Sequence, residues 1–440
     1  MSALAIGLVL FGAMLALMAL RVPIAIAMFV PGALGYWALS SEAALLSHLK
    51  GALYARFSVY DLSVIPLFLL MGQFATQGGL SAALFRAAAS FVGHFRGGLA
   101  MASVLACAAF GAICGSSVAT AATVAQVALP EMKRFNYSGR LATATLAAGG
   151  TLGILIPPSV VLVVYAILAQ QNIAKLFAAA MIPGIIAASG YMIAIAIYVR
   201  LHPDAGPAQA RHGWRERWTT LRDVWPVAAI FLVVFGGIYG GLFTPTEGAG
   251  VGAVGTFVAG LANRELDLRA IRASFLGAAD TSAMIFMIFL GADMLNSALA
   301  LSQMPAQLAE YVGSLHVAPL VIVAGVLVLY VVLGCVMDEL SMILLTIPVL
   351  FPAIMALDLF GLDPTEKAIW FGILVLMVVE IGLIAPPVGL NVYVVNGLAR
   401  DVPMSETYRG VTPFLISDAF RVLLLLFFPI VSLWLVRVLD

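Results

Sequence analysis

The sequence is poor in charged residues. Only 10% of its 440 residues are Asp, Glu, Lys or Arg, whereas soluble domains typically carry about 25%. Hydrophobic residues make up 63% of the chain, which is more than a protein of this size can bury, so many of them must face lipid. Lys plus Arg equals Asp plus Glu at 22 each, so no excess charge points to nucleic acid or to an acidic partner. The composition therefore predicts an integral membrane protein.

The chain also lacks the common catalytic and redox motifs. Its three cysteines, Cys107, Cys114 and Cys335, lie in apolar runs and form no CxxC pair, so we expect them to pack as small core residues. No HExxH or Walker A motif is present, and the GxGxxG match that begins at Gly250 lies in an apolar helical run. We therefore expect neither nucleotide use nor an enzymatic activity.

Long apolar runs are abundant. A membrane-spanning helix needs about 20 apolar residues, and the candidates lie at 3–20, 23–41, 62–78, 141–169, 177–199, 225–243, 248–263, 275–299, 368–399 and 411–436. Two longer stretches, 98–130 and 316–357, hold small or polar residues at their middle and prolines near their end. They are too long for one span and too polar at the centre for lipid contact. Each is interpreted as a re-entrant helical hairpin, which enters the membrane and turns back.

The basic residues are unevenly distributed along this pattern. The polar stretch 200–223 carries five arginines and is interpreted as a surface connector, with an amphipathic helix that holds Trp214, Trp218 and Trp225 at the membrane interface. If this connector is cytoplasmic and both hairpins return to their own side, sixteen basic residues lie inside and five outside. The bias predicts that the first hairpin enters from the cytoplasmic side and the second from the outer side.

The two hairpins belong to an internal repeat. GTLGILIPPSVV in the first half corresponds to EIGLIAPPVGLN in the second, and Gly153 and Pro157 match Gly382 and Pro386 at an offset of 229. Further matches at similar offsets are Gly111 with Gly334, Gly72 with Gly291, and Pro23 with Pro245. Hairpins that enter from opposite faces make the repeat an inverted one, as in many secondary transporters.

This repeat divides the chain into two halves, residues 1–200 and 224–440, joined by the connector 201–223. Each half is expected to contain scaffold helices, one hairpin and one broken helix. The broken helices are expected at about 141–169 and about 368–399. The predicted fold is thus an all-α, inverted-repeat transporter with two re-entrant hairpins and two broken helices.

Polar residues mark both hairpin tips. The first tip reads GSSVAT from Gly115 to Thr120; its glycine and serines break the helix and expose carbonyls and hydroxyls that suit a sodium ion, while helix N-termini favour an anionic substrate. The second tip carries Asp338 and Glu339, and an acid at membrane depth costs about 2.5–3.5 kcal/mol and is usually functional. We expect Asp338 to bind a cation or a proton. The alternatives are a packing interface of small residues at the first tip and solvated acids at the second.

Paired prolines interrupt one apolar span in each half. Proline has no N–H and clashes with the preceding turn, so the helix breaks and carbonyl oxygens are freed. The matched motifs predict broken helices that face the hairpin tips, with a simple kink as the alternative. Ser159 and Asn391, which follow the two motifs, and Glu380, which precedes the second, are further polar groups in apolar spans.

Five segments, in this order, resemble the large membrane subunit of tripartite ATP-independent periplasmic (TRAP) transporters. They are FGAICGSSVATAATV (110–124), TLGILIPPS (151–159), FTPTEGAGVGA (243–253), MDE (337–339) and EIGLIAPPVGLN (380–391). The resemblance covers nearly the whole chain. It implies a sodium-driven importer of small organic acids that works as an elevator, with the hairpins and broken helices moving against a scaffold. The chain departs from the family pattern at Cys114, where we expect serine, and at Ala385, where we expect threonine.

The resemblance also implies the sites. One sodium site would be lined by Gly115, Ser116, Ser117, Gly153 and Pro157. Its counterpart in the second half would be lined by Gly334, Asp338, Gly382 and Pro386. The organic acid would contact Ser116, Ser117, Thr120, Ser159 and Asn391.

The family further implies two partners, a small four-span membrane subunit and a soluble periplasmic substrate-binding protein. The chain would work within lipid in the bacterial inner (cytoplasmic) membrane, with Na+ as the coupling ion and without a nucleotide or nucleic acid. A stand-alone sodium- or proton-coupled anion carrier is the first alternative. A channel or an intramembrane enzyme is the second, and an enzyme would need a catalytic pair at depth, for which Asp280 and Asp293 are the nearest candidates.

Overall fold

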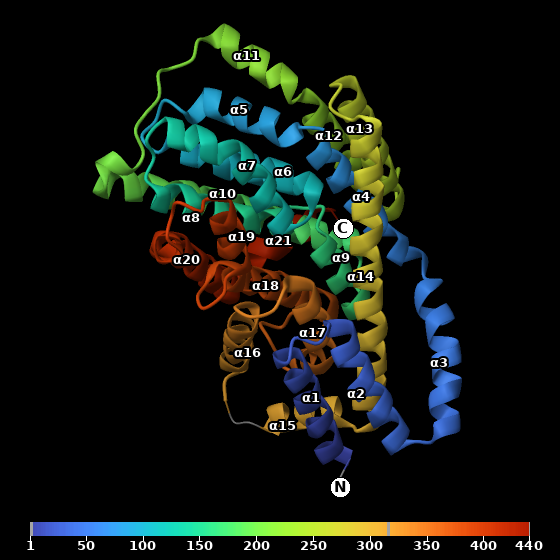
Figure 1. Cartoon of the computed structure of the whole chain (residues 1–440). Coiled ribbons are helices and arrows are strands. Elements are labelled where there is room, and N and C mark those ends of the chain that lie inside the picture. The colour runs from blue at the N-terminus through green and yellow to red at the C-terminus, as the bar shows by residue number, and fades with distance from the viewer. Residues whose placement is uncertain (1–2, 315–316, 440) are drawn as a thin grey trace.

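The computed structural model describes residues 3–314 and 317–439. Residues 1, 2, 316 and 440, which bound the predicted halves and the second hairpin, lie outside this part. Every regular element that is described is a helix (Figure 1). The predicted all-α class is confirmed over these residues.

The helices of the first half are α1 (Ala3–Ala19), α2 (Ile24–Leu39), α3 (Glu42–Phe57), the 3-10 helix η1 (Tyr60–Ser63), α4 (Val64–Gln77), α5 (Leu80–Val92), α6 (Gly98–Cys114), α7 (Ser117–Arg134), α8 (Gly139–Leu155), α9 (Val160–Ala169) and α10 (Ile173–Leu201). The connector holds the 3-10 helix η2 (Pro203–Ala205) and α11 (Trp214–Asp223). The second half holds α12 (Trp225–Tyr239), α13 (Pro245–Ala262), α14 (Leu268–Leu301), α15 (Met304–Ser314), α16 (Pro319–Gly334), α17 (Glu339–Met355), α18 (Pro364–Ile384), α19 (Leu390–Leu398), α20 (Met404–Phe427) and α21 (Ile430–Leu439).

The predicted hairpins and Pro-Pro spans correspond to interrupted pairs of helices. Gly115 and Ser116 separate α6 from α7, and residues 335–338 separate α16 from α17. The first Pro-Pro motif separates α8 from α9, which bend by 42° relative to each other, and the second separates α18 from α19. Both Pro-Pro bonds are cis. Three of these four breaks fall at glycines, serines or prolines, and the fourth, residues 335–338, directly follows Gly334.

The long helix α14 runs along one side of the molecule, with α3 farther out (Figure 1). Its 34 residues span about 50 Å at 1.5 Å per residue. It packs against α4 and α2 (Figure 1). Small residues allow the α2 contact: a Cβ atom added at Gly32 would lie 2.6 Å from the backbone nitrogen of Leu295, and one at Gly291 would lie 2.4 Å from the carbonyl oxygen of Ala25. Backbone-to-backbone packing through glycine is typical of membrane helices.

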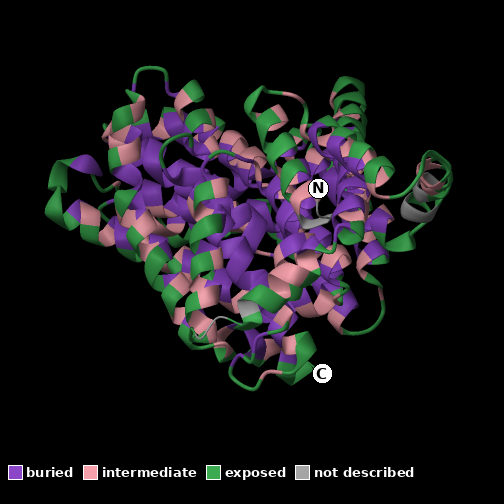
Figure 2. Ribbon diagram, turned by 90° about the horizontal axis from the view of Figure 1, so that it is seen from below, coloured by how far each residue is buried: buried purple, intermediate pink, exposed green. Residues whose placement is uncertain are grey.

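The broken helices occupy the centre of the bundle. Every residue of α8 from Leu141 to Leu155 is buried, and so is almost all of α18. The central helices are coloured as buried in Figure 2, whereas exposed residues lie on the outer helices. A helix that is apolar and buried all round lies inside a large bundle. α8 and α18, which lead into the two Pro-Pro motifs, are therefore among the most enclosed helices.

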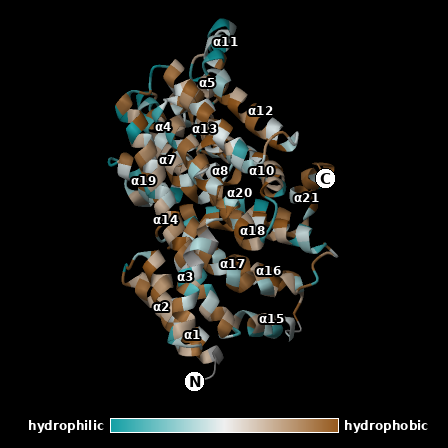
Figure 3. Ribbon diagram, turned by 90° about the vertical axis from the view of Figure 1, so that its right-hand side faces the viewer, coloured by the Kyte–Doolittle hydropathy of each residue, from teal (hydrophilic) through white to brown (hydrophobic). Residues whose placement is uncertain are grey.

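The outer helices expose apolar side chains. Leu232 on α12, Val254 on α13 and Val328 on α16 are each more than 60% exposed, and hydrophobic residues cover the outside of these helices in Figure 3. Among the described residues, α10, α14, α18 and α20 are each long and apolar enough to cross a membrane on their own. This outer surface has the composition of one that contacts lipid.

The structure adds helices that the apolar spans did not predict. Three helices, α3, α5 and α15, fall outside every predicted span. The apolar sequence of α3 contains the polar residues Glu42, His48 and Lys50, and the other two helices are short. The predicted span 411–436 is divided between α20 and α21, since Pro429 has no N–H to continue the helix. Hydropathy alone identifies neither a mixed-polarity helix nor a break at a single proline.

The connector contains the expected amphipathic helix, α11. Trp214, Trp218 and Trp225 are all about two-thirds exposed, as expected for side chains at a membrane interface. The prediction that all five arginines of the connector lie on the surface is wrong for Arg217. It is buried against α5, where its Nε donates to the carbonyl oxygen of Ser90 at 3.1 Å.

The α2–α14 contact generates a stability prediction. In Gly32→Ala the new methyl group meets the backbone of α14, so the two helices must separate, and we expect a loss of about 1–3 kcal/mol. Gly12→Ala on α1 is the matched control, because nothing lies within 4 Å of its Cβ position. Thermal unfolding of the purified protein in detergent measures both variants. Equal melting temperatures for the two would contradict the close packing of α2 on α14.

Candidate functional site

The break in the first hairpin is built from a glycine and two serines. Gly115 adopts a left-handed backbone (φ 64°) at the end of α6, which glycine tolerates and most side chains avoid. Ser116 is extended and caps α7, where its side-chain oxygen accepts a hydrogen bond from the amide of Ala119 at 3.5 Å. Ser117 is the first residue of α7 and is fully buried. A helix N-terminus and two hydroxyls thus meet at one point, an arrangement that favours an anionic group.

This first tip lies directly against the broken helix of its own half. A Cβ atom added at Gly153 would lie 2.5 Å from Oγ1 of Thr120 and 2.8 Å from the carbonyl oxygen of Ser116. One added at Gly115 would lie 3.0 Å from the carbonyl oxygen of Pro158. The predicted residues of the first site are therefore brought together in space.

The same type of backbone contact occurs in both halves. A Cβ atom added at Gly111 on α6 would lie 2.4 Å from Cα of Gly153 on α8. One added at Gly382 on α18 would lie 2.5 Å from the carbonyl carbon of Gly334 on α16. These four glycines are the ones that the sequence repeat pairs, Gly111 with Gly334 and Gly153 with Gly382. Only a residue without a Cβ permits so close an approach.

The paired prolines leave carbonyl oxygens without their helical donors. A carbonyl in an α-helix accepts from the N–H four residues later. Pro157 and Pro158 have no N–H, so the carbonyls of Gly153 and Ile154 lose their partners. The second Pro-Pro motif does the same for the two carbonyls that begin at Gly382. In each half, the first of the two freed carbonyls belongs to the glycine that contacts the hairpin, Gly153 or Gly382.

Asp338 caps the second helix of its hairpin. Its Oδ2 accepts from the backbone N–H of Ser341 at 3.1 Å, and its Oδ1 accepts from the Ser341 hydroxyl at 2.6 Å. Its neighbour Glu339 is buried, and Oε2 of Glu339 makes no hydrogen bond to any residue in the described part of the chain. The N-terminus of α17 therefore carries two carboxylates, and the cation-binding role of Asp338 stays a prediction.

Asn391 connects the two halves. Its Oδ1 accepts a hydrogen bond from the hydroxyl of Ser117 on α7 at 3.3 Å, and its Nδ2 donates to the carbonyl oxygen of Ala147 on α8 at 3.2 Å. Ser159, another predicted substrate contact, caps α9 by accepting from the amide of Leu162 at 3.3 Å. All three predicted side chains are buried and already hydrogen-bonded.

The two breaks differ in exposure. Pro157, Pro158 and Ser159 are buried, whereas Pro386, Pro387 and Val388 are exposed. At the second break Tyr408 on α20 donates its hydroxyl to the carbonyl oxygen of Val388 at 2.7 Å. One break is thus closed within the bundle, and the other is open to the surface.

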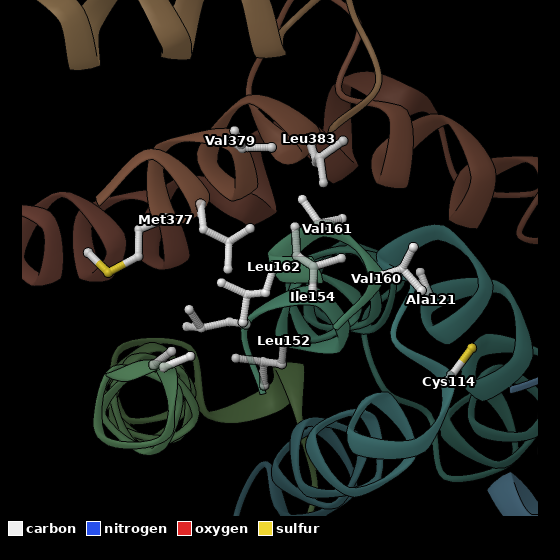
Figure 4. Packing of buried hydrophobic residues seen from close by; sticks show 14 of the residues in the cluster. Cys114, Ala121, Leu152, Ile154, Val160, Val161, Leu162, Met377, Val379 and Leu383 are labelled. Atoms are coloured by element: carbon white, nitrogen blue, oxygen red, sulfur yellow. The ribbon is translucent and has the colours of Figure 1, made fainter. Parts of the chain in front are cut away.

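Apolar side chains fill the space between the two breaks. In Figure 4, Leu383 of α18 points toward Val161 at the start of α9, and Val379 and Leu162 belong to the same apolar cluster. All four are buried. These buried apolar side chains pack α18 against α9, the helix that follows the first break.

A buried ion pair was missed by the sequence analysis. Arg421 on α20 is 2% exposed, and its Nη2 donates to Oε2 of Glu380 at 2.8 Å and to Oδ1 of Asp418 at 2.9 Å. The available signal was three charged residues in two long apolar spans, which is rare at membrane depth.

A second charged cluster lies where α7 ends and α8 begins, a part of the chain that the charge bias predicts to be cytoplasmic. Lys133 on α7 pairs with Asp401 at 2.6 Å, and Arg140 on α8 pairs with Glu406 on α20 at 2.5 Å. The hydrogen bond from Lys133 lowers the pKa of Asp401 below its usual value. A cavity of about 570 Å³ lies beside these pairs, lined in part by Tyr198 and Arg140. Both ion pairs join the first half to the second.

Residues 11–431 match the family model described as the tripartite ATP-independent periplasmic transporter, DctM component. The chain belongs to this family. It is thus the large permease subunit of a TRAP transporter, as its motifs predicted, and a multi-pass membrane transport protein.

Curated relatives agree with this assignment. The chain is 36% identical to the C4-dicarboxylate TRAP transporter large permease protein DctM of Pseudomonas aeruginosa, over 85% of this chain and 86% of that one. It is 31% identical to the protein of the same name from Rhodobacter capsulatus, over 97% and 98%. It is 27% identical to the ectoine TRAP transporter large permease protein TeaC of Halomonas elongata, over 97% and 98%.

A solved structure shares the fold. The YdaH transporter of Alcanivorax borkumensis, described as having an unusual topology, matches with a TM-score of 0.65 at 14% identity, over 90% of both chains. At this identity the likeness concerns the fold alone.

The glycine contact in the second half generates a prediction for transport. In Gly382→Ala the methyl group meets the backbone of Gly334, so the broken helix shifts away from its hairpin. We expect the uptake rate of the reconstituted transporter to fall by about a factor of ten or more. Gly397→Ala on α19 is the control, since nothing lies within 4 Å of its Cβ position. Wild-type uptake in both variants would show that this contact is dispensable.

Proposed function

We propose that this TRAP permease subunit imports a small organic acid by sodium-coupled secondary transport. The observation that carries the proposal is the matched glycine contact, Gly111 with Gly153 and Gly334 with Gly382. In each half it brings a hairpin to the point where paired prolines free two carbonyl oxygens. Unwound backbone of this kind coordinates Na+ in inverted-repeat transporters.

The proposed cation sites follow from this arrangement. The first would use Gly115, Ser116, Ser117, Gly153 and Pro157, and the second would use Gly334, Asp338, Gly382 and Pro386. The described residues contain no group of three or more His, Cys, Asp or Glu side chains that could hold a metal ion. A cation at either break would therefore depend mainly on carbonyl and hydroxyl oxygens, which suit a hard monovalent ion.

The proposed substrate is a carboxylate, in line with the C4-dicarboxylate names of two relatives. The N-termini of α7 and α9 lie beside the first break and carry partial positive charge toward it. Ser116, Ser117, Thr120, Ser159 and Asn391 would supply the hydroxyl and amide contacts. Rearrangement of the existing hydrogen bond between Ser117 and Asn391 would free both side chains for a substrate.

We further propose an elevator motion, in which the hairpins and broken helices move as one unit against a scaffold that includes α2, α4, α13 and α14. α14 packs against α2 and α4, α4 packs against α13, and the contact between α2 and α14 is made through glycines. The exposed apolar face of the scaffold would contact lipid and the small four-span subunit. A periplasmic binding protein would deliver the substrate at the inner membrane, with the α11 connector in the cytoplasm.

A stand-alone carrier coupled to sodium or protons is the alternative. It would need neither the small subunit nor the binding protein. Uptake by the reconstituted chain alone, at the rate of the complete system, would favour it.

Sodium dependence tests the coupling. The chain is reconstituted with its partners in liposomes, and uptake of a labelled dicarboxylate is measured with an inward sodium gradient and with an equal potassium gradient. We expect uptake against the concentration gradient only with sodium, because the cation sites supply the driving force. Equal accumulation in the two gradients rules out sodium coupling.

Asp338→Asn tests the carboxylate of the second site. Asparagine is as good a helix cap as aspartate, so the variant removes the charge while keeping the cap. We expect the sodium concentration for half-maximal uptake to rise roughly tenfold, about 1.4 kcal/mol of binding. Asp363→Asn is the control, since Asp363 caps α18 in the same way through the amide of Glu366 at 2.8 Å. Identical sodium dependence in the two variants would remove Asp338 from the site.

A further inference from the structure

Five buried polar side chains form a continuous chain through four helices. Thr151 on α8 lies 3.2 Å from the hydroxyl of Tyr191 on α10, and Tyr191 donates to Oδ2 of Asp418 on α20 at 2.9 Å. Asp418 and Glu380 on α18 both accept from Nη2 of Arg421. This polar chain of side chains begins in one broken helix, at Thr151, and ends in the other, at Glu380.

The two ends of this polar chain are equivalent positions of the repeat. Thr151 and Glu380 are separated by the offset of 229 that relates the two Pro-Pro motifs. Each lies two residues before the glycine that contacts its hairpin, Gly153 or Gly382. The polar chain therefore connects the two points at which carbonyl oxygens are freed.

A contribution to fold stability does not explain why these five polar side chains are buried together. Buried ion pairs are often no more stabilising than apolar residues of the same shape. Within the described residues, Nε and Nη1 of Arg421 and Oε1 of Glu380 make no hydrogen bond. The two carboxylates and one guanidinium also leave the group one negative charge in excess when all are ionised. Polar groups that are so costly at membrane depth are usually functional.

The middle of the polar chain comes from a matched pair of helices. α10 follows the broken helix of the first half, and α20 follows that of the second. Tyr191 packs edge-on against Phe414 of α20, with ring centroids 5.3 Å apart. The contact between α10 and α20 is thus both apolar and hydrogen-bonded, so a shift of one broken helix displaces the partner of the other.

We propose that Tyr191, Asp418 and Arg421 are positioning residues that couple the two helix breaks, so that cation binding at one break raises the affinity of the other. The coupling between cation sites rests on the proposed function, whereas the mechanical link between the breaks does not. In the described part of the chain, these three side chains hydrogen-bond to one another, to Thr151 and to Glu380, and they act on the breaks through Thr151 and Glu380.

Tyr191→Phe cuts the polar chain at its centre by removing one hydroxyl and keeping the ring. Tyr330→Phe is the matched control: Tyr330 is also fully buried, and its hydroxyl accepts from Thr346 within a single hairpin. Amide hydrogen exchange of the purified protein is followed in the peptides that cover 150–161 and 380–391. We expect Tyr191→Phe to accelerate exchange at both breaks by roughly fivefold, and Tyr330→Phe to leave the first break unchanged. Acceleration confined to α10 and α20, or none, overturns the mechanical link.

Sodium titration of uptake then tests the coupling between sites. We expect the wild-type protein and Tyr330→Phe to respond cooperatively and Tyr191→Phe to respond with a Hill coefficient near one, while Thr151→Val reproduces the effect from the other side. A lower maximal rate with unchanged cooperativity means that the residue is only structural and overturns the proposal. If uptake by the wild-type protein does not depend on sodium, the proposed function and the coupling of cation sites fail together, and the exchange data alone decide whether the two breaks are mechanically linked.

Discussion

The structure depends on one constraint, the contact without side chains between each hairpin and its broken helix. Gly111 against Gly153 and Gly334 against Gly382 bring two backbones within a distance that a single methyl group would prevent. The paired prolines then free carbonyls at that same glycine. Because irregular backbone is tolerated in a membrane only when protein or water surrounds it, α8 and α18 must be buried almost completely. The outer helices, with their exposed apolar faces, provide that enclosure.

Two halves of similar geometry carry different chemistry. The first tip offers the hydroxyls of Ser116 and Ser117, and the second offers the carboxylates of Asp338 and Glu339. The exposure of the breaks differs too, since Pro157 is buried and Pro386 is exposed. Asp338 is held as a helix cap by two hydrogen bonds from Ser341, whereas no hydrogen bond reaches Oε2 of Glu339 from the described residues. The two breaks therefore differ in chemistry and exposure, although they occupy equivalent positions of the repeat.

Features that are local in the sequence were predictable, and features that depend on how helices are rotated were not. The breaks at Gly115 and Pro157 follow from the backbone limits of glycine and proline. Matches at similar offsets were enough to pair each hairpin and each Pro-Pro motif with its counterpart. The bond between Ser117 and Asn391, and the burial of Arg217 against α5, depend on which face of each helix meets which neighbour. Hydropathy does not tell which face of a helix meets which neighbour. One sequence read by itself gives no other information on how the helices are rotated.

The buried ion pair shows which contacts can be predicted from one helix and which need the packing of several helices. Arg421 and Asp418 are three residues apart and therefore share one face of α20, so their pairing with each other could have been anticipated. Their partners Glu380 and Tyr191 come from two other helices, and only tertiary packing brings them together. Since each of these groups is costly in lipid without the others, they constrain the arrangement of α8, α10, α18 and α20 more strictly than the apolar residues around them. An apolar interface can slide and repack, whereas a hydrogen-bonded chain must either hold or break, and this is the property that the proposed elevator motion requires.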